Sequence, residues 1–168
     1  MTQNRTYGAS WGLSLKIMTG IAAGILLFMV ATGLTKNPGN TEGWTFFMVV
    51  LPLAVLGVSS LFSIHGYTVD GDTLLIHRIG WNSKVNLSRL VAAHVDPSAM
   101  NNSIRTFGNG GMFCFAGGYW NKKLRHYRAF ATAPKNSVIL RFPNRTVVVS
   151  PDDPAAFAEE MQRFTATS

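Results

Sequence analysis

Residues 105–130, RTFGNGGMFCFAGGYWNKKLRHYRAF, combine closely spaced glycines with a run of basic and aromatic side chains. Nucleotide-binding loops have glycines at similar spacing, but they need a particular continuation. A Walker loop has Lys and Ser or Thr directly after its last glycine, and a dinucleotide-binding turn opens a helix. Here Gly111 is followed by β-prone Met-Phe-Cys-Phe. The stretch therefore predicts β-structure, in which Gly108, Gly110 and Gly111 permit positive φ or a bulge at a tight strand connection.

The second part of the stretch carries eight basic and aromatic residues in ten positions around a predicted hairpin: Tyr119, Trp120, Lys122, Lys123, Arg125, His126, Tyr127 and Arg128. Anionic lipid headgroups attract basic residues near a membrane by about 1 kcal/mol each, and an acidic partner protein suits the same charges. Nucleic acid could stack on the rings, whereas a solvated tip needs no partner. We expect no nucleic-acid partner and assign headgroup or partner binding to Trp120, Lys122, Lys123, Arg125 and Arg128.

The composition indicates a membrane segment beside a mildly basic domain. The chain has 168 residues and a net charge of +7, yet only 14% of its residues are charged and 47% are hydrophobic. A soluble nucleic-acid-binding protein would carry far more charge. The single cysteine, Cys114, excludes an intramolecular disulfide and a multi-cysteine zinc site. Its apolar neighbours predict a packed thiol.

Two long apolar segments lie near the start of the chain, at residues 17–34 and 44–64. At about 1.5 Å per residue they reach roughly 27 and 32 Å, which matches a hydrocarbon core of about 30 Å. Trp11 and Trp44 stand near segment ends, where indole rings prefer the membrane interface. A cleaved signal peptide followed by a core helix is the alternative. Because a second segment follows so closely, the pattern favours a transmembrane hairpin.

The flanking charges predict the orientation of this hairpin. Four basic residues lie on one side of it: Arg5, Lys16, Arg78 and Lys84. The connecting loop carries only Lys36 against Glu42. Basic residues concentrate in cytoplasmic segments, so we expect both termini in the cytoplasm and residues 1–16 to form an N-terminal cytoplasmic segment.

Gly20 and Gly24 form a GxxxG pattern, which lets another helix approach closely. The second segment has small residues that could face it: Ala54, Gly57 and Ser60. That segment is therefore one candidate for the contact, and a helix from another subunit is the other. Pro52 should kink the second helix, because it removes a backbone hydrogen bond.

From residue 66 onward the pattern changes from helical to β-prone, with almost no linker. Short runs such as YTV, TLLIHRI, SVILRF and RTVVVS are separated by turn residues. About seven such strands predict an antiparallel β-sandwich or small barrel. A helix should follow, with Ser150 as N-cap, Pro151 at the first position and Asp153 as the capping-box carboxylate. An apolar face at helical spacing would lay this helix on the barrel: Phe157, Met161 and Phe164.

A barrel closed by one C-terminal helix resembles the bacterial pleckstrin-homology (PH) family found behind short membrane anchors. The matching segments are YTVDGDTLLI, RTFGNGGMFCFAGGYWNKKL, HYRAFAT and SPDDPAAFAEEM. This resemblance covers residues 66–164, leaves 165–168 as a tail, and implies a fold in a membrane setting with no established reaction. We therefore expect an α+β, two-pass protein of the bacterial inner (cytoplasmic) membrane.

The sequence offers little chemistry for catalysis. Its four histidines lack metal-ligand spacing, and no local nucleophile motif appears. We therefore expect no catalytic residue, no metal and no cofactor. The favoured function is an accessory or scaffolding protein whose hairpin and PH-like domain stabilise a partner membrane complex. The expected partners are membrane lipids and other integral membrane subunits, and the alternative function is a lipid-headgroup-sensing module.

Overall fold

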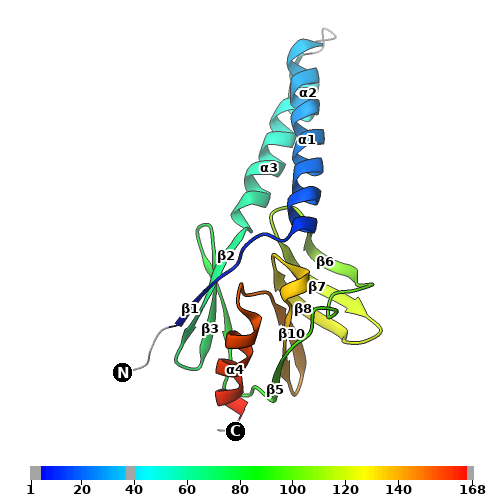
Figure 1. The fold of residues 1–168 in the computed structure, drawn as a ribbon. Coiled ribbons are helices and arrows are strands. Elements are labelled where there is room, and N and C mark those ends of the chain that lie inside the picture. Colours follow the sequence, from blue (N-terminus) through cyan, green and yellow to red (C-terminus); the bar gives the residue numbers. More distant parts are fainter. Residues whose placement is uncertain (1–4, 37–40, 166–168) are drawn as a thin grey trace.

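A computed structural model describes residues 5–36 and 41–165 of the chain. Figure 1 shows two long helical rods projecting side by side from a β-rich domain, with one further helix at the opposite end of that domain. The helices are α1 (Leu13–Thr35), α2 (Thr41–Thr45), α3 (Leu51–Leu61) and α4 (Pro154–Thr165), with a π-helical segment, Phe46–Val50, joining α2 to α3. A 3₁₀ turn, Pro134–Asn136, precedes one strand. We call α1 together with residues 41–61 the helix pair.

Both rods of the helix pair are long and apolar enough to cross a membrane, as the sequence predicts. Few of their residues are buried within the chain, and large apolar side chains face outward, such as Phe28 with 73% of its surface exposed. A core helix of a soluble domain would bury such residues. The boundaries differ slightly from the expected segments: α1 begins at Leu13, and the second rod ends at Leu61 because Ile64 already belongs to a strand.

The two rods pack closely at Gly33, not at the GxxxG pattern. A Cβ on Gly33 would lie 2.6 Å from Cβ of Met48, whereas an added Cβ on Gly20 or Gly24 meets no atom of the described residues within 4 Å. The interpretation that Gly20 and Gly24 face the second rod is therefore wrong. Both glycines are exposed, and the rods diverge toward the domain (Figure 1). A π-helical segment lies just before Pro52, which occupies the first turn of α3; the predicted kink at Pro52 stays a prediction.

The first sheet has four antiparallel strands in the order β1-β2-β3-β4, namely β1 (Arg5–Gly8), β2 (Ile64–Asp70), β3 (Thr73–Arg78) and β4 (Asn82–Asn86). The second has the order β5-β9-β10-β8-β7-β6, namely β5 (Ala92–Val95), β6 (Ile104–Gly110), β7 (Phe115–Asn121), β8 (Arg125–Ala131), β9 (Val138–Phe142) and β10 (Arg145–Val149). Among the strand pairs of the described residues, only β8 and β10 run parallel.

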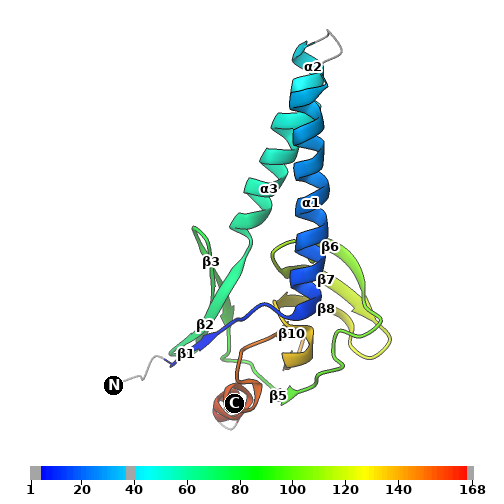
Figure 2. The same ribbon diagram turned by 45° about the horizontal axis from the view of Figure 1, so that its top comes forward.

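Two details of the predicted barrel are wrong. The described residues contain ten strands, not about seven, because β1 and β6 lie in polar or glycine-rich stretches without the usual strand signal. The sheets also do not close into a barrel. In the described part of the chain no strand of one sheet pairs with the other, and α4 lies across the open side between them (Figure 2). The core is therefore a sandwich, with α4 contributing Phe157 and Met161.

The strand β1 pairs antiparallel with β2, from Arg5 opposite Val69 to Gly8 opposite Gly66. The sequence predicted no element before the first helix. Since β1 runs into α1 and α3 runs into β2, the helix pair is inserted between two neighbouring strands. The side chain of Asp152 adds a second tie, because its oxygens accept hydrogen bonds from the backbone N–H (2.7 Å) and the hydroxyl (2.9 Å) of Ser10.

The C-terminal helix begins three residues later than its expected first position. Asp153, not Ser150, is the N-cap: its Oδ1 accepts a hydrogen bond from the backbone N–H of Ala156 at 3.0 Å. Ser150 is buried and serves β-structure instead, because its Oγ accepts from the backbone N–H of Thr132 at 2.7 Å. Pro154 therefore occupies the first helical position that the sequence analysis assigned to Pro151.

Tyr67 joins the two sheets inside the core. Its side chain is fully buried, and its hydroxyl donates to the carbonyl of Phe130 at 2.6 Å and accepts from the N–H of Ser150 at 3.1 Å. Removing the hydroxyl would leave two buried backbone groups without a partner. The sole cysteine, Cys114, belongs to the same core, so its exposure reports opening of this core.

We expect Tyr67→Phe to lower the unfolding free energy of the domain by about 1–3 kcal/mol, because unsatisfied buried groups cost that much. The measurement is the rate at which Cys114 of the full chain is alkylated at fixed pH. The variant should react faster than wild type. Equal rates would show that the Tyr67 hydroxyl contributes little to the core.

A second prediction concerns the helix pair. Gly33→Leu should lower the thermal stability of the detergent-solubilised chain, since its side chain would collide with Met48, and overpacking costs about 1–3 kcal/mol. Gly24→Leu is the matched control and should leave the melting temperature unchanged. Helical circular dichroism measures both, and an equal loss in the two variants would contradict the observed packing.

Candidate binding surface on the six-stranded sheet

The glycine-rich stretch forms the hairpin β6–β7, which has a bulge between Arg105 and Phe107. Gly108 and Gly117 face each other across it with φ of +94° and +138°. A Cβ on Gly108 would lie 2.3 Å from the carbonyl oxygen of Ala116, so only glycine fits there. The predicted backbone role is confirmed for Gly108.

The loop of this hairpin rests on α1. Gly111 has a φ of +114°, and a Cβ there would collide with the side chain of Met18. The hydroxyl of Thr19 donates to the Gly111 carbonyl at 3.2 Å and accepts from the N–H of Phe113 at 3.0 Å. Positive φ is therefore confirmed for Gly111, whereas Gly110 does not adopt it. The glycines let the loop follow the helix surface closely.

The turn between β7 and β8 is held in place from inside. The buried side chain of Asn121 donates to the carbonyl of Ala99 at 2.8 Å and accepts from the N–H of Leu124 at 2.7 Å. On its surface, Nζ of Lys123 lies 2.5 Å from Asp96. Burial opposes ionisation of Asp96, but bonds from Lys123 and Ser98 outweigh it and lower the pKa of this carboxyl. Lys123 therefore already forms an ion pair within the chain, with Asp96.

The strand register separates the predicted residues onto different faces. Trp120 lies opposite His126, and Arg128 lies opposite Gly118, so all three side chains share one face of the sheet. Farther along, that face forms the core, but near the β7–β8 turn nothing in the described residues covers it. Lys122 lies in the turn, and Arg125 is paired with Asn121 on the alternate face. Only Trp120 and Arg128 of the five predicted residues therefore share this face.

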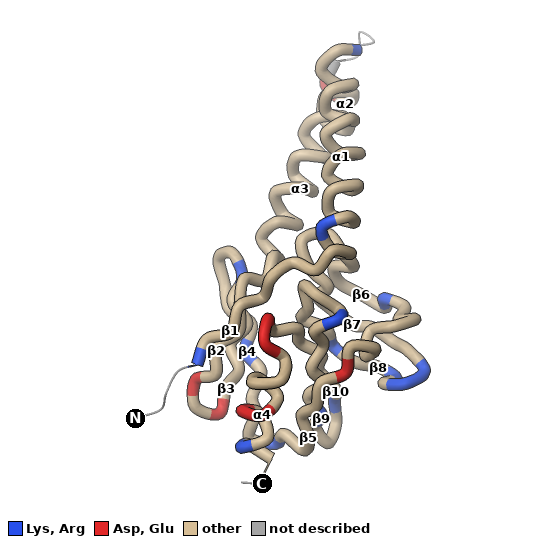
Figure 3. The backbone as a smooth tube through the Cα atoms, viewed as in Figure 1, with Lys and Arg blue, Asp and Glu red and all other residues tan. Residues whose placement is uncertain are grey.

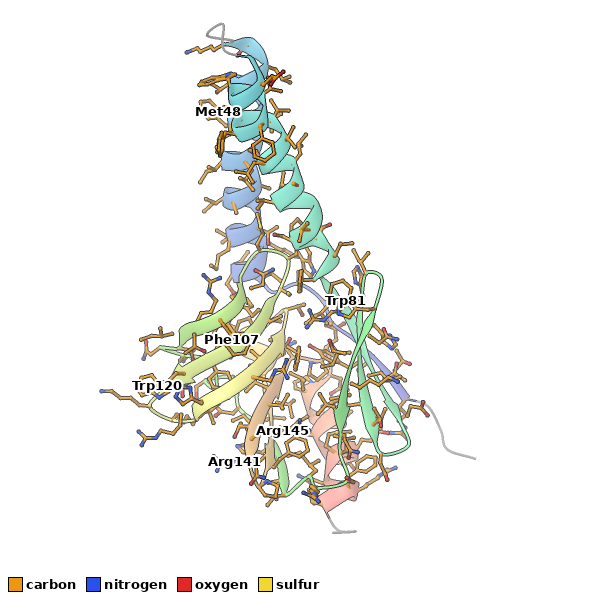
Figure 4. The ribbon with its side chains drawn as sticks, turned by 180° about the vertical axis from the view of Figure 1, so that it is seen from behind. Met48, Trp81, Phe107, Trp120, Arg141 and Arg145 are labelled. Carbon is orange, nitrogen blue, oxygen red and sulfur yellow. The ribbon has the colours of Figure 1, made fainter. Side chains whose placement is uncertain are left out.

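Other residues complete this surface. Arg145 lies two positions before Val147, which pairs with Arg128 across the parallel strands, so the two arginines point to the same side. Phe107 and Ile104 join from β6 and are 61% and 65% exposed. We call the set the basic face: Ile104, Phe107, Trp120, His126, Arg128 and Arg145. Figure 4 shows Phe107, Trp120 and Arg145 on the same side of the domain.

A shallow depression of about 310 Å³ lies on the basic face, with Phe107, His126, Arg128 and Arg145 in its lining. Arg128 and Arg145 lie over aromatic rings, with their guanidinium carbons 5.4 Å from the centre of Phe130 and 4.8 Å from that of Phe142. Such contacts fix the long side chains without neutralising them. Within the described residues neither arginine forms an ion pair.

The segment that forms the basic face carries positive charge only. Residues 97–151 contain eight Lys and Arg but no Asp or Glu, a net charge of +8, while the whole chain carries +7. Figure 3 shows basic residues spread over the six-stranded sheet and acidic residues gathered mainly toward β2, β3 and α4. This asymmetry was readable from the sequence. The position of Arg145 beside Arg128 was not, because it depends on the parallel pairing of β8 with β10.

The residues that could take part in catalysis or hold a metal ion have the features of structural residues. Cys114 is buried, and this burial raises the pKa of its thiol to about 11, so the thiol stays protonated at neutral pH. Among the described residues there is no group of three or more His, Cys, Asp and Glu that could hold a metal ion. The side chains of the basic face are cationic and aromatic.

The chain thus contains an α+β domain, in which a C-terminal helix closes two packed sheets. The apolar helix pair is attached to this domain. The bacterial PH domain family matches the chain over residues 65–164, and the chain belongs to that family. This confirms the resemblance stated from the sequence. A comparison with curated proteins gave no match.

Proposed function

We propose that this protein is a non-enzymatic accessory or scaffolding protein of the bacterial inner membrane. The helix pair spans the bilayer, and the PH-like domain and both termini lie in the cytoplasm. The outward-facing apolar side chains of both rods support membrane insertion. The excess of basic residues on the domain side supports this orientation.

The main support for this proposal is the rigid junction between the helix pair and the domain. The N–H of Gly12 donates to the carbonyl of Thr132 at 3.1 Å, and the hydroxyl of Thr132 donates to the carbonyl of Ser10 at 3.0 Å. Thr19 is bonded to the β6–β7 loop about two turns farther along α1. A domain fixed in this way presents its surfaces in one orientation, as a subunit of an assembly requires.

The partner that suits the basic face is an acidic surface of another membrane protein. Charge complementarity favours such a partner, since no acidic residue of residues 97–151 competes for Arg128 or Arg145. The exposed rings of Phe107 and Trp120 add the aromatic contacts common in interfaces. Lipid headgroups suit the position less well, because Arg145 lies on the part of the domain away from the helix pair (Figure 4).

The open side of α1 provides a second contact for the same partner. Gly20 and Gly24 are exposed, and no part of the described chain approaches them. A helix of the partner could pack there closely, as GxxxG patterns allow. Gly20→Leu together with Gly24→Leu should then weaken the assembly without affecting the domain.

The test is gentle detergent extraction of the full chain from its native membranes, followed by native sizing. Wild type should migrate in a larger complex. Arg128→Glu with Arg145→Glu should reduce its retention at least tenfold, roughly 1.4 kcal/mol, because opposed like charges are costly at an interface.

Arg141→Glu is the matched control for this experiment. Arg141 is an exposed cation of β9 that pairs with Thr146, and therefore points to the side opposite Arg145. It should leave the complex intact. Migration of wild type as a small free particle would contradict the partner proposal. Binding of anionic vesicles by the chain in neutral nanodiscs, lost in the Arg128 and Arg145 variant, would then favour headgroup sensing.

A further inference from the structure

The turn between β3 and β4, residues 79–81, exposes two large apolar side chains. Ile79 and Trp81 are 44% and 40% exposed, and Gly80 between them has a φ of +93°. The N–H of Arg78 donates to the carbonyl of Trp81 at 3.1 Å and closes the turn. We call residues 79–81 the Trp81 tip. It is a fixed turn with an apolar apex.

The Trp81 tip lies against the end of α3. The ring of Trp81 meets that of Phe62, the residue that caps α3, edge to face with centroids 5.1 Å apart. Figures 1 and 4 both place this turn at the end of the domain nearest the helix pair. If α3 spans a bilayer, the tip therefore lies at the depth where that helix leaves the hydrocarbon core.

A cation lies directly behind the apolar apex. The guanidinium carbon of Arg78 is 5.8 Å from the ring centres of both Phe62 and Trp81, and 5.4 Å from that of Phe130. Arginine keeps its charge in proteins, and these rings hold its position. Its Nε is buried without a hydrogen-bond partner in the described residues. An apolar apex backed by a cation matches the order of hydrocarbon and phosphate at a membrane surface.

We infer that the Trp81 tip inserts into the interfacial layer of the leaflet facing the domain, with Arg78 at the depth of the lipid phosphates. Trp prefers this layer because its ring is apolar and its N–H is polar. The surface is continuous with the apolar surface of α3, which favours lipid over a protein partner as its occupant. The inference rests on the proposed membrane anchoring and adds a third attachment point, which limits tilting of the domain.

The four tryptophans of the chain allow a direct test. Full-length variants that keep one of Trp44, Trp81 and Trp120, with all other tryptophans replaced by phenylalanine, are reconstituted into phosphatidylcholine vesicles. The acyl chains carry bromine, which quenches nearby indole fluorescence, at shallow or deep positions. Trp81 should be quenched at least twofold, and more strongly by shallow bromine than by deep bromine. Trp120 should be nearly unaffected.

The controls separate this inference from the anchoring on which it rests. Quenching of Trp44 without quenching of Trp81 would overturn the tip insertion and keep the anchoring. A Trp44 that is not quenched would overturn both. Equal quenching of Trp81 and Trp120 would mean that the whole domain lies on the bilayer, which also contradicts insertion of this tip alone.

A second measurement avoids removing several tryptophans. In a Cys114→Ala background, Ile79→Cys carries an environment-sensitive fluorophore, and Val91→Cys, exposed on the loop before β5, is the matched reference. On transfer from detergent to vesicles, the label at position 79 should shift to shorter wavelength while the label at position 91 stays unchanged. Equal behaviour of the two labels would contradict the inference.

Discussion

The pairing of β1 with β2 is the constraint on which the rest of the structure depends. These two strands flank the helix pair in the chain and lie side by side in the sheet, from Arg5 opposite Val69 to Gly8 opposite Gly66. The helix pair therefore occupies the place of the loop in a β-hairpin. Both of its ends are fixed by backbone hydrogen bonds of the same ladder. A domain joined to a membrane by one flexible linker would have no such restraint.

The β1–β2 pairing fixes the positions of the exposed surfaces relative to the helix pair. The domain contacts α1 through Thr19 and the β6–β7 loop, and contacts the end of α3 through Trp81. With the helix pair held on both sides, the Trp81 tip and the basic face have fixed and different heights relative to the helix ends. We propose lipid as the partner of the Trp81 tip and an acidic protein surface as the partner of the basic face. Neither role requires the domain to move.

Much of the architecture could be predicted because its causes are local. Long apolar runs specify the helix pair, and the apolar spacing of Phe157, Met161 and Phe164 specifies α4. Features with distant causes were missed. The strand β1 is formed by polar or small residues that pair with β2 and contact α4 through Tyr7, and Ser150 bonds to Thr132 instead of capping the helix. Likewise Arg145 joins Arg128 only through a parallel strand pair, and Gly33 replaces Gly20 and Gly24 in the helix contact because of how the rods diverge.

The most direct test of this account measures whether the helix pair and the domain move as one body. In a Cys114→Ala background, spin labels at Leu34, exposed near the end of α1, and at Val91, exposed on the domain, would be placed on the full chain in nanodiscs. Pulsed electron resonance then gives the distribution of distances between them. The account predicts a single narrow distribution. A broad or multiple distribution would show that the domain swings beneath the membrane, and would contradict a junction made rigid by the β1–β2 pairing.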